Sequence, residues 1–131
     1  MKVISDDIKK GEFKSVYLLY GEEEYLKKQY RDRLKNAIAG DDTMNYSYYD
    51  SDNASVKDII DVCETLPFFA QKRLVIMENT GFLKSSNDEL ADYIKHIPDY
   101  LVVVMVEKDV DKRNTVSYTH LRAHETDSYL V

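Results

Sequence analysis

Short apolar runs alternate with amphipathic stretches along this chain. Three uninterrupted runs, bounded by polar residues or by Gly or Pro, predict strands that are covered on both faces: Val16–Tyr20, Leu74–Met77 and Leu101–Val106. The segment Met44–Tyr49 alternates apolar and polar residues over its first five positions, which is typical of an edge strand with one wetter face. We therefore expect four strands, one of them at an edge.

Between these runs the apolar residues recur at a helical spacing. The predicted helices are Ile4–Lys10, Glu22–Ile38, Ser55 to about Leu66, and Asp88–Ile97. Ser55, with Asp58 three residues later, is expected to cap the third of them. Strands that alternate with helices predict an α/β fold, in which right-handed crossovers build a mainly parallel sheet with helices on both faces.

Composition narrows the class of protein. The 131 residues make one domain's worth of chain, and the formal net charge of −6 argues against a general nucleic-acid binder. A single cysteine, Cys63, excludes an internal disulfide framework and a cysteine-based zinc site. The longest apolar run is far shorter than the about 20 residues of a membrane helix, and the first ten residues lack the apolar stretch of a signal peptide. We expect a soluble, cytoplasmic protein with no membrane partner.

The turn after the first expected strand is where a nucleotide-binding α/β protein holds phosphate, with the pattern G-x-x-x-x-G-K-[ST]. This chain instead has Gly21-Glu-Glu-Glu-Tyr-Leu-Lys27, without the second Gly or the hydroxyl residue. Three carboxylates occupy the turn and would repel a polyphosphate. We therefore expect a degenerate nucleotide site at Gly21 and no cofactor. We also expect no metal, because Glu78-Asn79 supplies only one carboxylate after the later strand.

An aromatic pair precedes the strand that begins at Leu74. Phe68 and Phe69 cannot both face one core from a regular element, and Pro67 blocks continuation of the helix before them. An exposed pair on a loop would suit docking into a partner's apolar pocket. The alternative is one ring in the core and the other on a short turn, with Lys72-Arg73 as a solvated pair.

Three further features carry less information. The charged run Glu107–Arg113 follows the last expected strand, where functional residues of parallel sheets gather, although such a run is usually a solvated loop. His120 and His124 have the spacing of a helical metal pair, but they lie in residues 116–131, which show neither a clear period nor a strand. Cys63 lies on an apolar helical stripe and is expected in the core.

Three segments together carry a resemblance to a known family: Val16–Leu26, Leu66–Ile76 and Asp109–Arg113. In order and spacing they are similar to the N-terminal domain of the delta subunit of bacterial DNA polymerase III, over about residues 1–115. The resemblance implies an AAA+/RecA-like fold and a clamp-loader subunit that has lost nucleotide binding. Such a subunit is not catalytic by itself; it binds the sliding clamp and helps to open the ring for loading onto primed DNA.

The resemblance also assigns a binding loop. In the family, an apolar residue followed by Phe, just before the third strand, inserts into an apolar pocket of the clamp, and this pair falls on Phe68 and Phe69. The residues implied around the pair are Leu66, Pro67 and Ala70, which shape the loop, and Lys72 and Arg73, which meet acidic groups on the clamp rim.

The resemblance ends near residue 115, where a delta subunit continues into lid and collar domains. We expect residues 1–115 to be the clamp-binding domain. Residues 116–131, which look like translated sequencing-adapter sequence, are expected to be a non-native tail that packs poorly and carries no site. Other clamp-loader subunits would bind through the domains missing here, and primer-template DNA only in the assembled loader.

Two other classes stay open. A small nucleotide- or phosphate-binding α/β enzyme would use the Gly21 turn and the Lys112-Arg113 loop. A response-regulator-like domain would need a phosphoacceptor Asp with acidic partners at the strand ends, and neither Tyr20-Gly21 nor Glu78-Asn79 supplies that set.

Overall fold

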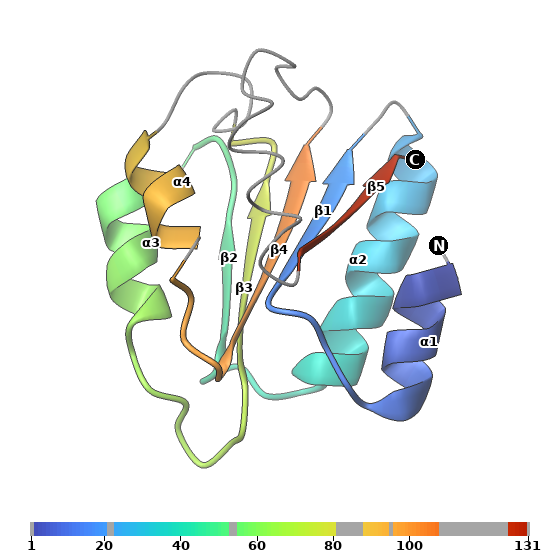
Figure 1. Cartoon of the computed structure of the whole chain (residues 1–131), viewed down its shortest axis with the longest axis horizontal. Coiled ribbons are helices and arrows are strands. Elements are labelled where there is room, and N and C mark those ends of the chain that lie inside the picture. Colours follow the sequence, from blue (N-terminus) through green and yellow to red (C-terminus); the bar gives the residue numbers. More distant parts are fainter. Residues whose placement is uncertain are drawn as a thin grey trace.

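A computed structural model shows a five-stranded parallel sheet between two layers of helices (Figure 1). It describes residues 2–20, 23–52, 55–80, 88–94, 96–107 and 126–130. The elements along the chain are α1 (Lys2–Lys10), β1 (Val16–Tyr20), α2 (Glu24–Ile38), β2 (Tyr46–Tyr49), α3 (Val56–Cys63), β3 (Arg73–Glu78), α4 (Asp88–Ile94), β4 (Leu101–Glu107) and β5 (Thr126–Leu130). The strand order is β2-β3-β4-β1-β5, and all the neighbouring strands pair in parallel. The predicted fold class is confirmed.

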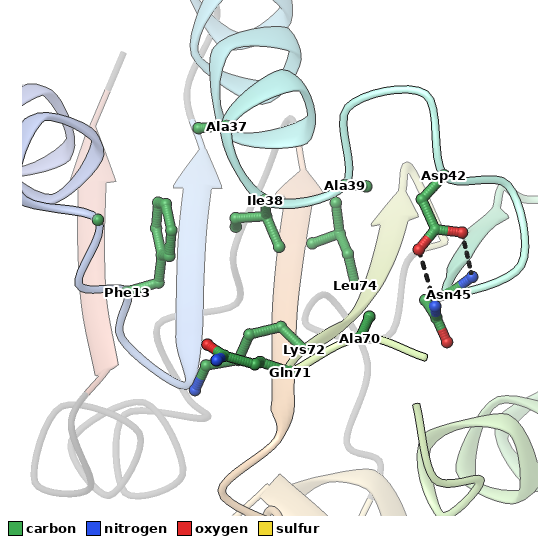
Figure 2. A pocket seen from close by; sticks show the side chains of 11 residues that line it. Phe13, Ala37, Ile38, Ala39, Asp42, Asn45, Ala70, Gln71, Lys72 and Leu74 are labelled. Carbon is green, nitrogen blue, oxygen red and sulfur yellow. Dashed lines mark hydrogen bonds between the residues drawn. The ribbon is translucent and has the colours of Figure 1, made fainter. Parts of the chain in front are cut away.

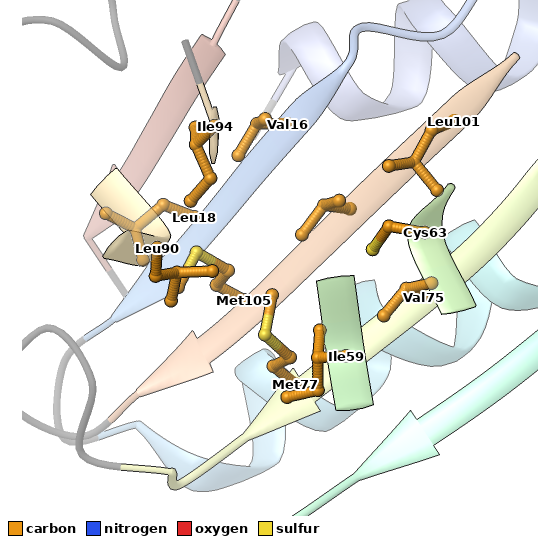
Figure 3. Packing of buried hydrophobic residues seen from close by; sticks show 11 residues of the cluster. Val16, Leu18, Ile59, Cys63, Val75, Met77, Leu90, Ile94, Leu101 and Met105 are labelled. Carbon is orange, nitrogen blue, oxygen red and sulfur yellow. The ribbon is translucent and has the colours of Figure 1, made fainter. Parts of the chain in front are cut away.

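The two faces of the sheet are covered by different helices. Helices α1 and α2 lie on one side of the sheet, and α3 and α4 lie on the other (Figure 1). Side chains from each pair of helices pack on the face that they cover. Successive residues of a strand alternate between these layers: Val16 and Leu18 face α3 and α4 (Figure 3), whereas Tyr17 and Leu19 face α1 and α2. Every residue of β3 and β4 is buried, which explains the uninterrupted apolar runs Leu74–Met77 and Leu101–Val106 within these strands.

Strand β2 lies at the edge of the sheet, as the alternating pattern predicts, and its side chains are only partly buried or exposed. It begins at Tyr46, two residues later than predicted. Asn45 lies just before it and still contributes to the sheet, because its carbonyl accepts a hydrogen bond from the Leu74 N–H at 2.8 Å. The side chain of Asn45 binds the backbone of Phe68 in the loop before β3.

Helix α3 departs from the prediction at both ends. Ser55 is the N-cap residue, but its side chain makes no capping hydrogen bond, so the expected capping box is wrong. The helix ends at Cys63 instead of near Leu66. The carbonyls of Thr65 and Leu66 accept hydrogen bonds from the Arg73 side chain, which holds this part of the chain in a loop.

The end of the chain also departs from the prediction. Residues 126–130 form β5, which pairs with β1 over its whole length, so the expectation of no strand there is wrong. The physical reason is the edge of β1: once β4 pairs on one side, the other side offers a row of backbone N–H and C=O groups that an extended segment can join. Residues 108–125, including His120 and His124, lie outside the described residues.

Candidate functional site

The connection between α3 and β3 projects beyond the end of the sheet at which β3 begins (Figure 1). It carries three large apolar side chains that face solvent: Leu66 is 71% exposed, Phe68 51% and Phe69 94%. Pro67 is partly buried and Ala70 is exposed. Both rings of the aromatic pair therefore lie outside the core. The alternative with one ring in the core does not describe this structure.

The two rings contact each other. Their centroids lie 4.4 Å apart with an interplanar angle of 73°, an edge-to-face arrangement. Phe69 has a φ of +54°, a left-handed backbone conformation that costs an L-residue with a bulky side chain roughly 1–2 kcal/mol. Residues held in such conformations concentrate at functional sites. The loop thus bears strain and leaves a ring in water, and neither contributes to the stability of the fold.

Asn45, from the turn before β2, holds this loop in place. Its side-chain Oδ1 accepts a hydrogen bond from the Phe68 N–H at 2.5 Å, and its Nδ2 donates to the Phe68 carbonyl at 2.7 Å. Nδ2 also donates to Oδ2 of Asp42 at 2.7 Å, and Figure 2 shows these two side chains facing each other. The hydrogen bond from Asn45 is the largest cause that lowers the pKa of the Asp42 carboxyl below its ordinary value.

Arg73 and Lys72 support the loop from its other end. The Arg73 side chain is buried, with Nε 2.9 Å from the Thr65 carbonyl and one guanidinium Nη 3.3 Å from the Leu66 carbonyl. Lys72 Nζ donates to the Asp99 carbonyl at 2.9 Å. The interpretation of Lys72-Arg73 as a solvated pair is therefore wrong for Arg73, whose buried side chain holds the loop through these bonds, whereas Lys72 is only partly buried.

A cavity of about 310 Å³ lies beside the loop (Figure 2). Its apolar wall is formed by Phe13, Ile38 and Leu74, and Ala70, Gln71 and Lys72 close it on the side of the loop. Asp42 and Asn45 line it as well, so the hydrogen-bonded support of Phe68 borders this cavity.

The other end of the sheet, at the carboxyl ends of the strands, is where parallel α/β proteins bind ligands. In this protein it is filled by internal polar contacts. Lys27 stands at the lysine position of the degenerate phosphate loop, and its side chain is fully buried. Its Nζ lies 2.9 Å from Oε1 of Glu24 and 3.4 Å from the backbone carbonyl of Glu107. The Glu107 carboxylate accepts hydrogen bonds from both the N–H and the hydroxyl of Thr80, at 3.2 and 2.8 Å. Lys27 is thus engaged by the protein itself.

A second cluster of polar side chains lies at the same end of the sheet. The Glu78 carboxylate, buried at the end of β3, accepts from Arg31 of α2 at 2.5 Å and from the Tyr48 hydroxyl at 2.8 Å. Burial, followed by the hydrogen bond to Glu78, raises the pKa of Tyr48 to about 12. Within the described ranges, no group of three or more His, Cys, Asp and Glu side chains could hold a metal ion. Gly21 and the Lys112-Arg113 loop, which the rival enzyme would use, lie outside those ranges.

A model of the family described as DNA polymerase III, delta subunit, matches residues 17–126 of the sequence. The chain belongs to the DNA polymerase III delta subunit family. The match runs past residue 115 into the segment that was expected to be non-native. DNA polymerase III subunit delta of Bacillus subtilis (strain 168) is 32% identical to this member over 110 residues, which are 76% of this chain and 32% of that protein. This delta-family chain therefore spans about a third of the length of the curated relative.

Solved structures agree with the fold of the delta family. The Bacillus subtilis DNA clamp loader delta protein matches with a TM-score of 0.83 at 27% identity, over 98% of this chain and 42% of that one. A DNA polymerase III gamma subunit-related protein from Thermotoga maritima matches with a TM-score of 0.65 at 12% identity, over 99% of this chain and 45% of that one, and shows the fold alone. The predicted AAA+-like α/β architecture is confirmed. Among the described helices, none is long and apolar enough to cross a membrane.

Sequence reasoning located the loop but missed the residue that holds it. Asn45 lies in the predicted edge strand, where an Asn is expected to face solvent, yet it is only 2% exposed. The available signal is Asp42 three residues earlier, because Asp and Asn at that spacing form local side-chain hydrogen bonds in turns. Its partner on the loop, Phe68, lies 23 residues further along the chain, so the local sequence pattern does not predict this contact.

Proposed function

We propose that this chain is the clamp-binding domain of a clamp-loader delta subunit, and that Phe68 and Phe69 are the side chains that dock into the sliding clamp. The observation that carries the proposal is the exposed, edge-to-face pair on a braced loop, with Phe69 94% exposed in a left-handed backbone conformation. Large rings that enter an apolar pocket supply a major share of binding energy at protein interfaces. Leu66, Pro67 and Ala70 shape the loop beside them, and Lys72 lies at its edge.

The mechanism is differential binding of two states of the ring. A subunit can open a closed ring only to the extent that it binds the open form more tightly than the closed form. A rigid loop serves this purpose because its rings are already placed before the clamp arrives, so less conformational entropy is lost on binding. The work of ATP hydrolysis belongs to other loader subunits, and this domain binds without catalysis.

Clamp binding by ring-deletion variants tests the proposal. The full chain is titrated against the sliding clamp of Bacillus subtilis, alongside Phe68→Ala and Phe69→Ala. We expect at least one variant to lose ten-fold or more in affinity, which corresponds to about 1.4 kcal/mol. Tyr25→Ala is the matched control, because Tyr25 is an exposed aromatic on α2, away from the loop. Unchanged affinity in both Phe variants would refute the docking role.

The boundaries and further partners are part of the same proposal. Residues 1–115 form the binding unit, residues 116–131 are a non-native tail, and other loader subunits and primer-template DNA are reached through the lid and collar domains of a delta subunit. The protein works in the cytoplasm. A chain that ends at residue 115 should bind the clamp as tightly as the full chain does, although it loses the pairing of β5 with β1.

The rival function is nucleotide binding at the Gly21 turn. The described residues at the carboxyl ends of the strands do not support it. Lys27 is bound to Glu24 and to the Glu107 carbonyl and points into the protein. Titration with ATP and magnesium should give no saturable signal. Saturable ATP binding would favour the enzyme class instead.

A further inference from the structure

We infer that Asn45 is a positioning residue for the proposed docking loop, which is the connection of residues 64–72 between α3 and β3: its side-chain amide fixes the backbone of Phe68 and, through it, the placement of both rings. The inference rests on the proposed function, since it concerns the same loop. Asn45 does not itself present a surface to a partner, because its side chain is almost entirely buried. Its influence on binding must therefore act through Phe68.

The contacts of Asn45 satisfy both backbone groups of one loop residue. Oδ1 accepts from the Phe68 N–H, and Nδ2 donates to the Phe68 carbonyl, at 2.5 and 2.7 Å. This is the pattern with which a neighbouring strand would bind an extended residue, supplied here by one side chain. Without it, a backbone N–H and a carbonyl in a partly buried position would lack these partners, which is costly.

Asp42 decides which way the amide of Asn45 faces. Nδ2 has two hydrogens, and the structure directs one to Oδ2 of Asp42 and the other to the Phe68 carbonyl. A flipped amide would place its oxygen against the carboxylate and the carbonyl, and its NH₂ against the Phe68 N–H. Both contacts would be repulsive, so Asp42 and Phe68 together allow one orientation.

The loop is thus held at two points, with the strained residue directly after the second. Arg73 binds the carbonyls of Thr65 and Leu66, and Asn45 binds Phe68. Pro67 between them has a fixed φ. The sharp change of direction therefore falls on Phe69, whose φ is +54°. Release of Phe68 would let Phe69 relax and let both rings move, and pre-organisation of the binding surface would be lost.

The test pairs a structural measurement with a binding measurement. Asn45→Ala and the isosteric Asn45→Asp are compared with the unchanged chain for amide hydrogen exchange at Phe68 and for affinity for the Bacillus subtilis clamp. We expect Phe68 exchange to rise at least ten-fold in Asn45→Ala, which loses the acceptor of the Phe68 N–H, and affinity to fall about ten-fold in both variants. Asn45→Asp separates hydrogen bonding from space filling, because a carboxylate has the same shape but cannot donate to the Phe68 carbonyl. Affinity for Asn45→Asp equal to that of the unchanged chain would overturn the inference.

Controls separate loop placement from general instability. Ile4→Val removes one buried methylene from α1, on the face of the sheet away from α3, and should lower thermal stability without changing clamp affinity. If Asn45→Ala does not fold, Asp42→Ala replaces it, because Asp42 orients Asn45 from the surface. Asp42→Ala should also speed Phe68 exchange and weaken binding, and no change in either quantity would overturn the inference.

Failure of the inference is distinguishable from failure of the proposed function. Should Phe68→Ala and Phe69→Ala weaken clamp binding while Asn45→Ala and Asn45→Asp do not, the docking function stands and the positioning role is wrong. Should the unchanged chain fail to bind the clamp at all, the proposed function is wrong, and hydrogen exchange at Phe68 still decides whether Asn45 holds the loop. In a double-mutant cycle, Asn45→Ala should cost less in the Phe68→Ala background, because part of its effect on binding acts through the Phe68 ring.

Discussion

Lys27 of α2 donates to the backbone carbonyl of Glu107 at the end of β4, over 3.4 Å, with its side chain fully buried. In a nucleotide-binding relative of this fold, a lysine at this position would reach toward phosphate. Here it joins the first turn of α2 to the central part of the sheet. The lysine has become a structural contact, and its replacement should affect stability instead of ligand binding.

Lys27 variants should separate packing from charge. Lys27→Ala leaves a cavity and deprives the Glu107 carbonyl of this donor, and we expect a loss of about 3 kcal/mol in the free energy of unfolding. Lys27→Met keeps most of the volume and removes a buried charge, so it should stay within about 1 kcal/mol of the unchanged chain. Urea unfolding measures both. Equal stability of Lys27→Ala and the unchanged chain would contradict the structural role.

Phe69 should show a trade between stability and binding. Glycine adopts a φ of +54° without strain, whereas alanine does not. Phe69→Gly should therefore be more stable than Phe69→Ala by about 1 kcal/mol, and both should lose clamp binding. Thermal unfolding of the two variants checks the first statement and clamp titration checks the second. Greater stability of the alanine variant would show that the strain is absent in solution.

The ion pair of Glu78 with Arg31 should support the fold without affecting the docking loop. Glu78→Gln keeps the shape but removes the charge that faces Arg31 and accepts from Tyr48. We expect a loss of about 2 kcal/mol in the free energy of unfolding, less than for a fully enclosed pair because Asp32 also contacts Arg31. Clamp affinity should stay unchanged, since β3 separates Glu78 from the loop. Asp32→Asn, at an exposed carboxylate, is the control and should change stability little.

Cys63 should make stability fall at alkaline pH. Burial is the main cause that raises the pKa of its thiol from 9.0 to about 12. In the unfolded chain the thiol ionises near pH 9, whereas in the folded chain it stays protonated, so the folded state holds more protons between these values. Stability therefore decreases as pH rises from about 9 to about 12. Cys63→Ala should flatten this part of the curve of unfolding free energy against pH. A slope equal to that of the unchanged chain would contradict the assignment.

The same burial should protect Cys63 from reagents that attack thiolates. In the folded chain the thiol is buried at the end of α3 and stays protonated at neutral pH. An aromatic disulfide reagent should react slowly in buffer and rapidly in urea. Rapid reaction in buffer would mean that α3 opens readily.

The sequence predicted the buried strands well because burial on both faces produces uninterrupted apolar runs, as in Leu101–Val106. It also placed β2 at an edge, since a strand with one wetter face alternates. The limits of α3 were predicted less well. They depend on Arg73, ten residues beyond the end of the helix, whose side chain binds the loop carbonyls. Local pattern carries no information on such a contact.

The candidate site was predictable only in part for the same reason. Pro67 and two adjacent aromatics indicated an exposed loop, and both rings are exposed. The left-handed conformation of Phe69 and the support from Asn45 arise from tertiary contacts between segments that are distant in the sequence. Strand β5 was missed because its pairing depends on the open edge of β1, and its own residues show no strand pattern.

The direction of β3 has a mechanical consequence. This strand starts at the docking loop and is hydrogen-bonded to β2 on one side and to β4 on the other, in parallel register. A partner that pulls on the loop along the strand axis would load both ladders in shear, so many hydrogen bonds would share the force at once. Tension applied at Phe68 and Phe69 would thus be carried into the centre of the sheet, and the domain would resist deformation under that load.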